Sequence, residues 1–61
     1  MNNENYIANI IMKYDELMML KENRGISYGE IAYIQNLSKK ELKEIDEEIE
    51  NEIARITSED E

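Results

Sequence analysis

The pattern that most constrains this chain is a helix-capping box that occurs twice, at residues 27–30 (SYGE) and 38–41 (SKKE). In a capping box, the Ser side chain accepts a hydrogen bond from the backbone N–H of the Glu, and the Glu carboxylate accepts one from the backbone N–H of the Ser. The two boxes therefore predict a short helix over residues 28–35 and a second helix that begins at residue 39. Between them, Asn36 predicts a left-handed helix stop, because Asn tolerates that conformation better than most non-glycine residues.

Apolar residues spaced three and four apart predict two long helices. The first covers residues 4–23, with Asn2 or Asn3 as its cap and Gly25 as its left-handed stop. Its inward stripe consists of Ile7, Ile10, Ile11, Tyr14, Leu17 and Met18. The second long helix covers residues 39–57, and its stripe consists of Leu42, Ile45, Ile49, Ile53 and Ile56.

These three helices predict an all-α fold in one domain that spans residues 1–61. Each long helix has one strong stripe, so we expect residues 4–23 and 39–57 to pack as an antiparallel pair. The short helix over residues 28–35 would brace one end of this pair. Residues 57–61 contain no apolar side chain, which predicts a frayed tail.

The chain contains neither Cys nor His. Disulfides are therefore excluded, and zinc sites and general-base catalysis lose their usual residues. A domain of this size buries only about 60% of the surface that its unfolded chain exposes, so a homodimer is one way to enlarge the core. Tyr6, Met12 and Met19 lie outside the main stripe of the first helix. They complete a small core, form a dimer seam, or make an apolar patch for a partner.

The sequence predicts no enzyme activity, no cofactor and no metal site. Ser27 and Ser38 are explained as helix caps, and there is no acidic calcium-binding loop and no Glu-x-x-His pair. No segment approaches the roughly 20 apolar residues that span a membrane, and the N-terminal residues lack the basic start of a signal peptide. We therefore expect a cytoplasmic protein without a membrane segment.

The negative charge is concentrated in the last third of the chain. Residues 1–40 contain five acidic and five basic residues, whereas residues 41–61 contain ten acidic and two basic ones. The whole net charge of −8 therefore lies in residues 41–61, and such an asymmetry bears on partners rather than on fold. Five carboxylates of the third helix form a predicted partner-binding face: Glu41, Glu44, Glu47, Glu48 and Glu52.

An acidic helix face has two interpretations. Residues four apart on a helix are about 6 Å apart along its axis, so a row of carboxylates presents charge to a basic groove much as a phosphate backbone does. Alternatively, the face is solvated and only keeps a small protein in solution. Like charges four residues apart destabilise a helix, which favours a partner as the reason for keeping them.

Residues 27–45 resemble the helix-turn-helix of sigma-factor and response-regulator DNA-binding domains. The matching positions are Ser27, Glu30, Ile31 and Ala32, then Leu37 and Ser38, then Leu42 and Ile45. The resemblance implies a dimeric DNA-binding regulator in which Ala32 allows the helices to approach closely. Lys39, Lys40 and Lys43 would then contact DNA. The sequence departs from this pattern at Gln35 and Asn36, and the acidic third helix opposes the neutralisation of phosphates that DNA binding requires.

The size, narrow composition and concentrated charge are similar in kind to accessory proteins of phages and mobile elements in low-GC bacteria, which include anti-CRISPR inhibitors. This resemblance implies a non-enzymatic inhibitor or regulator in the host-cell cytoplasm. Its acidic helix would bind the basic surface of a nucleic-acid-handling protein, as a mimic of DNA. The alternatives are the dimeric DNA-binding regulator and a structural oligomerisation module.

Overall fold

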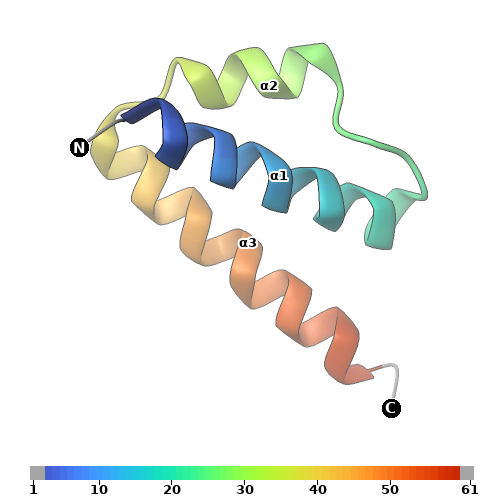
Figure 1. The fold of residues 1–61 in the computed structure, drawn as a ribbon. Coiled ribbons are helices and arrows are strands. Elements are labelled where there is room, and N and C mark those ends of the chain that lie inside the picture. The colour runs from blue at the N-terminus through green and yellow to red at the C-terminus, as the bar shows by residue number, and fades with distance from the viewer. Residues whose placement is uncertain (1–2, 60–61) are drawn as a thin grey trace.

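The computed structural model describes residues 3–59 and contains three α-helices, which confirms the predicted all-α fold (Figure 1). The helices are α1 (Asn3–Glu22), α2 (Tyr28–Gln35) and α3 (Lys39–Glu59). The predicted bounds of α2 are matched, those of α1 are shifted by one residue, and α3 continues two residues past its predicted end. The predicted cap Asn2 and residues 60–61 of the predicted tail lie outside the described residues.

The two long helices run in the same general direction, so the predicted antiparallel pairing is wrong (Figure 1). Ion pairs show the direction, because Lys13 of α1 reaches Asp46 and Glu50 of α3, and Lys21 reaches Glu52 further along both helices. The physical reason is that each of the two short connections reverses the chain. Helix α2 therefore runs opposite to α1, and α3 runs opposite to α2, which restores the direction of α1.

Helix α1 packs against both other helices and supplies half of the buried core. The buried side chains are Ile10, Leu17 and Met18 of α1, Ile34 of α2, and Leu42 and Ile49 of α3. Around them lie half-buried residues from both predicted stripes, namely Ile7, Ile11, Tyr14, Ile45, Ile53 and Ile56, together with Ile26 and Leu37 from the connections. The apolar stripes read from the sequence are therefore the surfaces that form the core.

The connection between α1 and α2 differs from the prediction at its stop. The left-handed residue is Asn23, with φ 59°, whereas Gly25 has a negative φ. The carboxylate of Asp15 organises the rest of this connection, because its Oδ1 accepts a hydrogen bond from the N–H of Ile26 at 2.8 Å. A Cβ atom on residue 25 would lie 3.1 Å from the same oxygen, so Gly25 provides room for Asp15 rather than a left-handed turn.

Both predicted capping boxes are present. The Oγ of Ser27 accepts from the N–H of Glu30, and the Oγ of Ser38 accepts from the N–H of Glu41, each at 3.2 Å. The two Glu carboxylates accept from the N–H of their Ser residues, each at 2.9 Å.

The predicted left-handed stop at Asn36 is wrong, because Asn36 has φ −100° and ψ 3°. Its side-chain Nδ2 donates to the carbonyl oxygen of Ala32 at 2.8 Å, and its N–H donates to the carbonyl of Tyr33 at 3.2 Å. These bonds satisfy carbonyl groups at the end of α2, which a left-handed residue would otherwise help to satisfy.

Candidate functional site

The carboxylates of α3 separate into two sets, and the first set is paired with α1. Asp46 and Glu50 both accept hydrogen bonds from the ammonium group of Lys13, with the contact to Asp46 at 2.9 Å. The Oε1 of Glu52 lies 3.3 Å from the Nζ of Lys21. The bonds to Glu50 and then to Asp46 raise the pKa of Lys13 above its ordinary value. These three carboxylates therefore form ion pairs with lysines of α1 within the molecule.

The second set points away from α1. Glu44, Glu47 and Glu48 are exposed, and none of them forms an ion pair within residues 3–59. Glu41 is also exposed, but one carboxylate oxygen accepts from the N–H of Ser38, and this bond lowers the pKa of Glu41. The predicted partner-binding face thus contains three unpaired carboxylates, one carboxylate that caps a helix, and Glu52, which is paired with Lys21.

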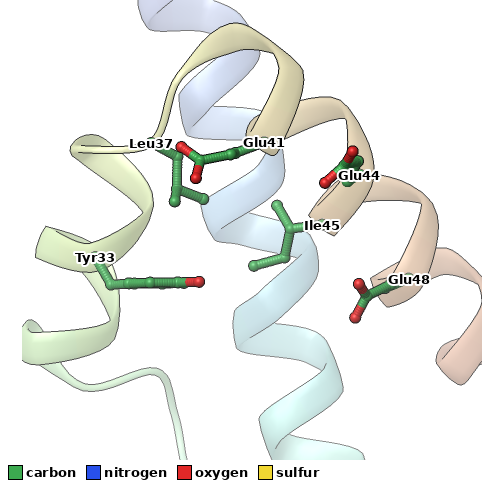
Figure 2. Close-up of a pocket in the computed structure, with 6 residues that line it drawn as sticks. All are labelled: Tyr33, Leu37, Glu41, Glu44, Ile45 and Glu48. Carbon is green, nitrogen blue, oxygen red and sulfur yellow. The ribbon is translucent and has the colours of Figure 1, made fainter.

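A groove between α2 and α3 brings part of this second set next to apolar side chains (Figure 2). Its volume is ≈ 190 Å³. The residues that line it are Tyr33 of α2, Leu37 of the connection, and Glu41, Glu44, Ile45 and Glu48 of α3. Figure 2 shows the Tyr33 ring projecting from α2 toward Ile45, with Glu44 and Glu48 on the opposite side. We refer to these six residues as the α2–α3 groove.

Tyr33 was not among the site residues predicted from the sequence. In the structure its side chain is 58% exposed and lines the groove. A local signal exists, because Tyr33 is a large apolar residue of a helix whose inward positions are already filled by Ile31 and Ile34. The sequence does not, however, place Tyr33 beside Glu44 and Glu48, since that neighbourhood depends on how α2 lies against the rest of the fold.

The predicted apolar patch is divided between two sides of α1. Tyr6, Met12 and Met19 are 36%, 68% and 50% exposed. Met12 and Met19 are two helical turns apart and share one side, whereas Tyr6 is rotated from Met12 by about a third of a turn. Met12 and Met19 are therefore a pair on the outer surface, to which Tyr6 does not belong.

The three lysines of the helix-turn-helix resemblance lie in the first two turns of α3. Lys39, Lys40 and Lys43 are exposed, and they make no ion pair with any residue that the structure describes. Ala32 is exposed as well, whereas the resemblance implies a small residue at a close contact between helices.

No known protein family matches the chain, and neither a curated protein nor a solved structure shows significant similarity to it. Among residues 3–59, no helix combines the length and apolar character needed to cross a membrane. The same residues contain no group of three or more side chains placed to hold a metal ion.

Proposed function

We propose that this protein is a non-enzymatic binding protein whose acidic α3 face engages a basic surface of another protein. The face consists of Glu44, Glu47 and Glu48. The partner that fits best is a nucleic-acid-handling protein, because the surface with which such a protein binds phosphates is basic. By covering that surface, the acidic face would inhibit or regulate the partner. The observation that carries the proposal is the division of α3 into a paired and an unpaired set of carboxylates.

The unpaired set is unfavourable for the isolated protein. Glu44 and Glu48 are four residues apart on the exposed surface, and like charges at this spacing destabilise a helix by a few tenths of a kcal/mol. The cations of α1 offset the charge of the other set but leave this one unneutralised. A basic partner would relieve the repulsion, and steering by opposite charges would speed its association.

The test is affinity capture from the cytoplasm of the native cell at about 0.1 M and about 1 M salt, where charges are screened beyond roughly 10 Å and 3 Å respectively. We expect a basic nucleic-acid-binding protein to be captured at low salt and released at high salt. The variant E44Q/E47Q/E48Q should lose the partner. Glu52 is left unchanged, because its substitution would also break the ion pair with Lys21.

The control is Glu16→Gln, since Glu16 is exposed on α1 and its substitution changes the net charge by the same amount as each single substitution in the face. E44Q, E47Q and E48Q should each weaken capture more than E16Q does. If the partner is retained at high salt, or if E16Q weakens capture as much as the face variants, the acidic face is not the binding surface.

DNA binding is the second candidate, and the exposure of Lys39, Lys40 and Lys43 favours it. On α3, however, Glu44 follows Lys40 by one turn and Glu47 follows Lys43 by one turn, so carboxylates would approach the phosphates together with the lysines. This candidate predicts that duplex DNA is bound at low salt and that K39A/K40A abolishes the binding. An absence of any shift with mixed genomic duplexes at low salt would exclude it.

A further inference from the structure

Tyr33 is the side chain of the α2–α3 groove whose exposure has no explanation within the isolated fold. Its ring is 58% exposed on a domain too small to leave much apolar surface uncovered without cost. Its hydroxyl makes no hydrogen bond with residues 3–59. Leu37 and Ile45 lie half-buried beside it and give the groove an apolar floor. Aromatic side chains of this kind, within a ring of polar residues, are frequent centres of binding energy in protein interfaces.

The dimensions of the groove indicate what kind of ligand enters it. Pockets for small molecules range from about 300 to 1,000 Å³ and enclose most of the ligand. The groove, at ≈ 190 Å³, is smaller than this range and is partly open to solvent. Such a volume suits one large apolar side chain delivered by a macromolecule, which makes its remaining contacts around the rim.

The charge of the side chains at the rim of the groove indicates which class of macromolecule binds there. Glu41, Glu44 and Glu48 lie along the α3 side of the groove, opposite Tyr33, and no basic side chain lines it. Phosphates would be repelled, which excludes nucleic acid from this position. The side chains that complement the rim are Lys and Arg. Because Glu44 and Glu48 are about 6 Å apart along α3, two basic groups on either side of an apolar residue can reach them together.

We infer that the α2–α3 groove binds a cationic peptide segment of a partner protein, in which one apolar side chain lies between Tyr33 and Ile45 and flanking Lys or Arg residues pair with Glu44 and Glu48. This inference rests on the proposed function and specifies the chemistry of the partner. It adds an apolar anchor that attraction between charges alone would not require.

The probe is the peptide Lys-Arg-Trp-Arg-Lys, and its matched control is Lys-Arg-Ser-Arg-Lys, which has the same charge. The chain contains no Trp, so the indole fluorescence of the first peptide reports burial of the anchor alone. Titration into isotopically labelled protein should shift the backbone amide signals of Tyr33, Leu37 and Ile45. We expect the Trp peptide to bind roughly tenfold more tightly than the Ser peptide.

Two tyrosines of the same helix provide the matched variants. Tyr33→Ala should weaken the Trp peptide by roughly tenfold and leave the Ser peptide nearly unaffected. Tyr28→Ala removes the same ring from a position that is 92% exposed and outside the groove, and should change neither affinity. Glu48→Gln should weaken both peptides, and more strongly than Glu16→Gln does. Helicity measured by circular dichroism confirms that each variant is folded.

Three results would overturn the inference. If both peptides bind equally, the acidic face attracts cations without an anchor, and the proposed function stands while the groove has no role. If neither binds, the groove is not a peptide site, and the salt-dependent capture experiment separately decides the fate of the proposed function. If the amide signals of the groove shift with protein concentration before peptide is added, a second copy of this chain occupies it.

Discussion

At the scale of single residues, Asp15 organises a connection that lies ten residues further along the chain. Its carboxylate accepts the N–H of Ile26 at 2.8 Å and lies where any Cβ on residue 25 would approach within 3.1 Å. Asp15 and Gly25 therefore work together, because one supplies the acceptor and the other leaves room for it. This bond anchors the backbone at Ile26, whose side chain packs against the core just before the cap of α2.

Replacing Asp15 by Ala should destabilise the fold. The substitution leaves the half-buried N–H of Ile26 without its acceptor, which costs about 1–2 kcal/mol for a charge-assisted bond that is partly exposed. Asp15→Asn keeps an acceptor oxygen and should cost less. Urea denaturation followed by circular dichroism measures the difference. Glu16→Ala, at the exposed neighbouring position, is the control, and equal losses for Asp15→Ala and Glu16→Ala would contradict this role.

Arg24 and Glu30 form the second residue-scale device in this connection. The guanidinium of Arg24 donates to both oxygens of Glu30, at 3.1 and 3.2 Å, and also to Glu22 at 3.0 Å. The hydrogen bonds from Arg24, and then that from the N–H of Ser27, lower the pKa of Glu30 to about 2. Glu30 therefore links the end of α1 to the cap of α2 as long as it is ionised.

The stability of the protein should depend on pH through Glu30. The pKa of Glu30 is lower in the folded state than its ordinary value of 4.5, so its stabilising effect is fully present above pH 4.5 and is lost as the pH falls toward about 2. The difference in unfolding free energy between the wild type and Glu30→Gln should shrink across this range. Urea denaturation at several pH values measures it. A constant difference between pH 6 and about pH 2 would contradict the lowered pKa.

At the scale of the helices, the two capping boxes determine where α2 and α3 begin. They fix the first residues of α2 and α3, and between these residues the chain has room only for a two-turn helix and a short connection. Helix α3 then has three different sides along its length. One is the apolar stripe, one carries the carboxylates paired with α1, and one is the unpaired acidic face. The repulsion within that acidic face makes the N-terminal cap of α3 important for its stability.

Ser38→Ala should destabilise α3 by about 1 kcal/mol, because the N–H of Glu41 loses its acceptor. Ser38→Asp retains an acceptor at the cap and should recover most of the loss. Ser58→Ala, in the last turn of the same helix, removes a hydroxyl from an exposed position and serves as the control. The measurement is the urea midpoint. Equal midpoints for Ser38→Ala and Ser58→Ala would show that the cap has no energetic role.

At the scale of the whole molecule, the direction of α3 decides which charges meet. Because α3 runs parallel to α1, Lys13 reaches Asp46 and Glu50, and Lys21 reaches Glu52. An antiparallel arrangement would place Lys21 near the start of α3 instead. In the observed parallel arrangement, the last turn of α2 comes near the first half of α3, and the groove lined by Tyr33 and Glu48 lies between them.

The parallel arrangement predicts a specific pattern of paramagnetic broadening. The described residues contain no Cys, so Asn51→Cys introduces a unique attachment site for a spin label at an exposed position of α3. The label should broaden amide signals near Lys21 more than those near Ile7, which lies about 21 Å further back along α1. Stronger broadening at Ile7 would instead indicate antiparallel helices.

The sequence by itself determined the helices, the two N-terminal capping boxes and the residues of the core. Ser27 with Glu30, and Ser38 with Glu41, form their hydrogen bonds within a single turn, so their pattern is complete in four residues. The apolar stripes depend only on helical spacing. The helix stops were less well predicted. The left-handed residue is Asn23 rather than Gly25, and Asn36 uses its side chain to donate to the carbonyl of Ala32 instead of adopting a left-handed backbone.

Only the tertiary structure decided how the charges of α3 are used. The sequence placed Glu44, Glu48 and Glu52 in one acidic row, but the fold pairs Glu52 with Lys21, which is 31 residues away along the chain. It likewise brings Tyr33 of α2 opposite Glu48 of α3, so that the two side chains line opposite sides of a groove. The physical reason is that such contacts depend on the direction and crossing of whole helices. Those are set by packing between distant side chains, whereas the helices themselves are set by neighbours within about four residues.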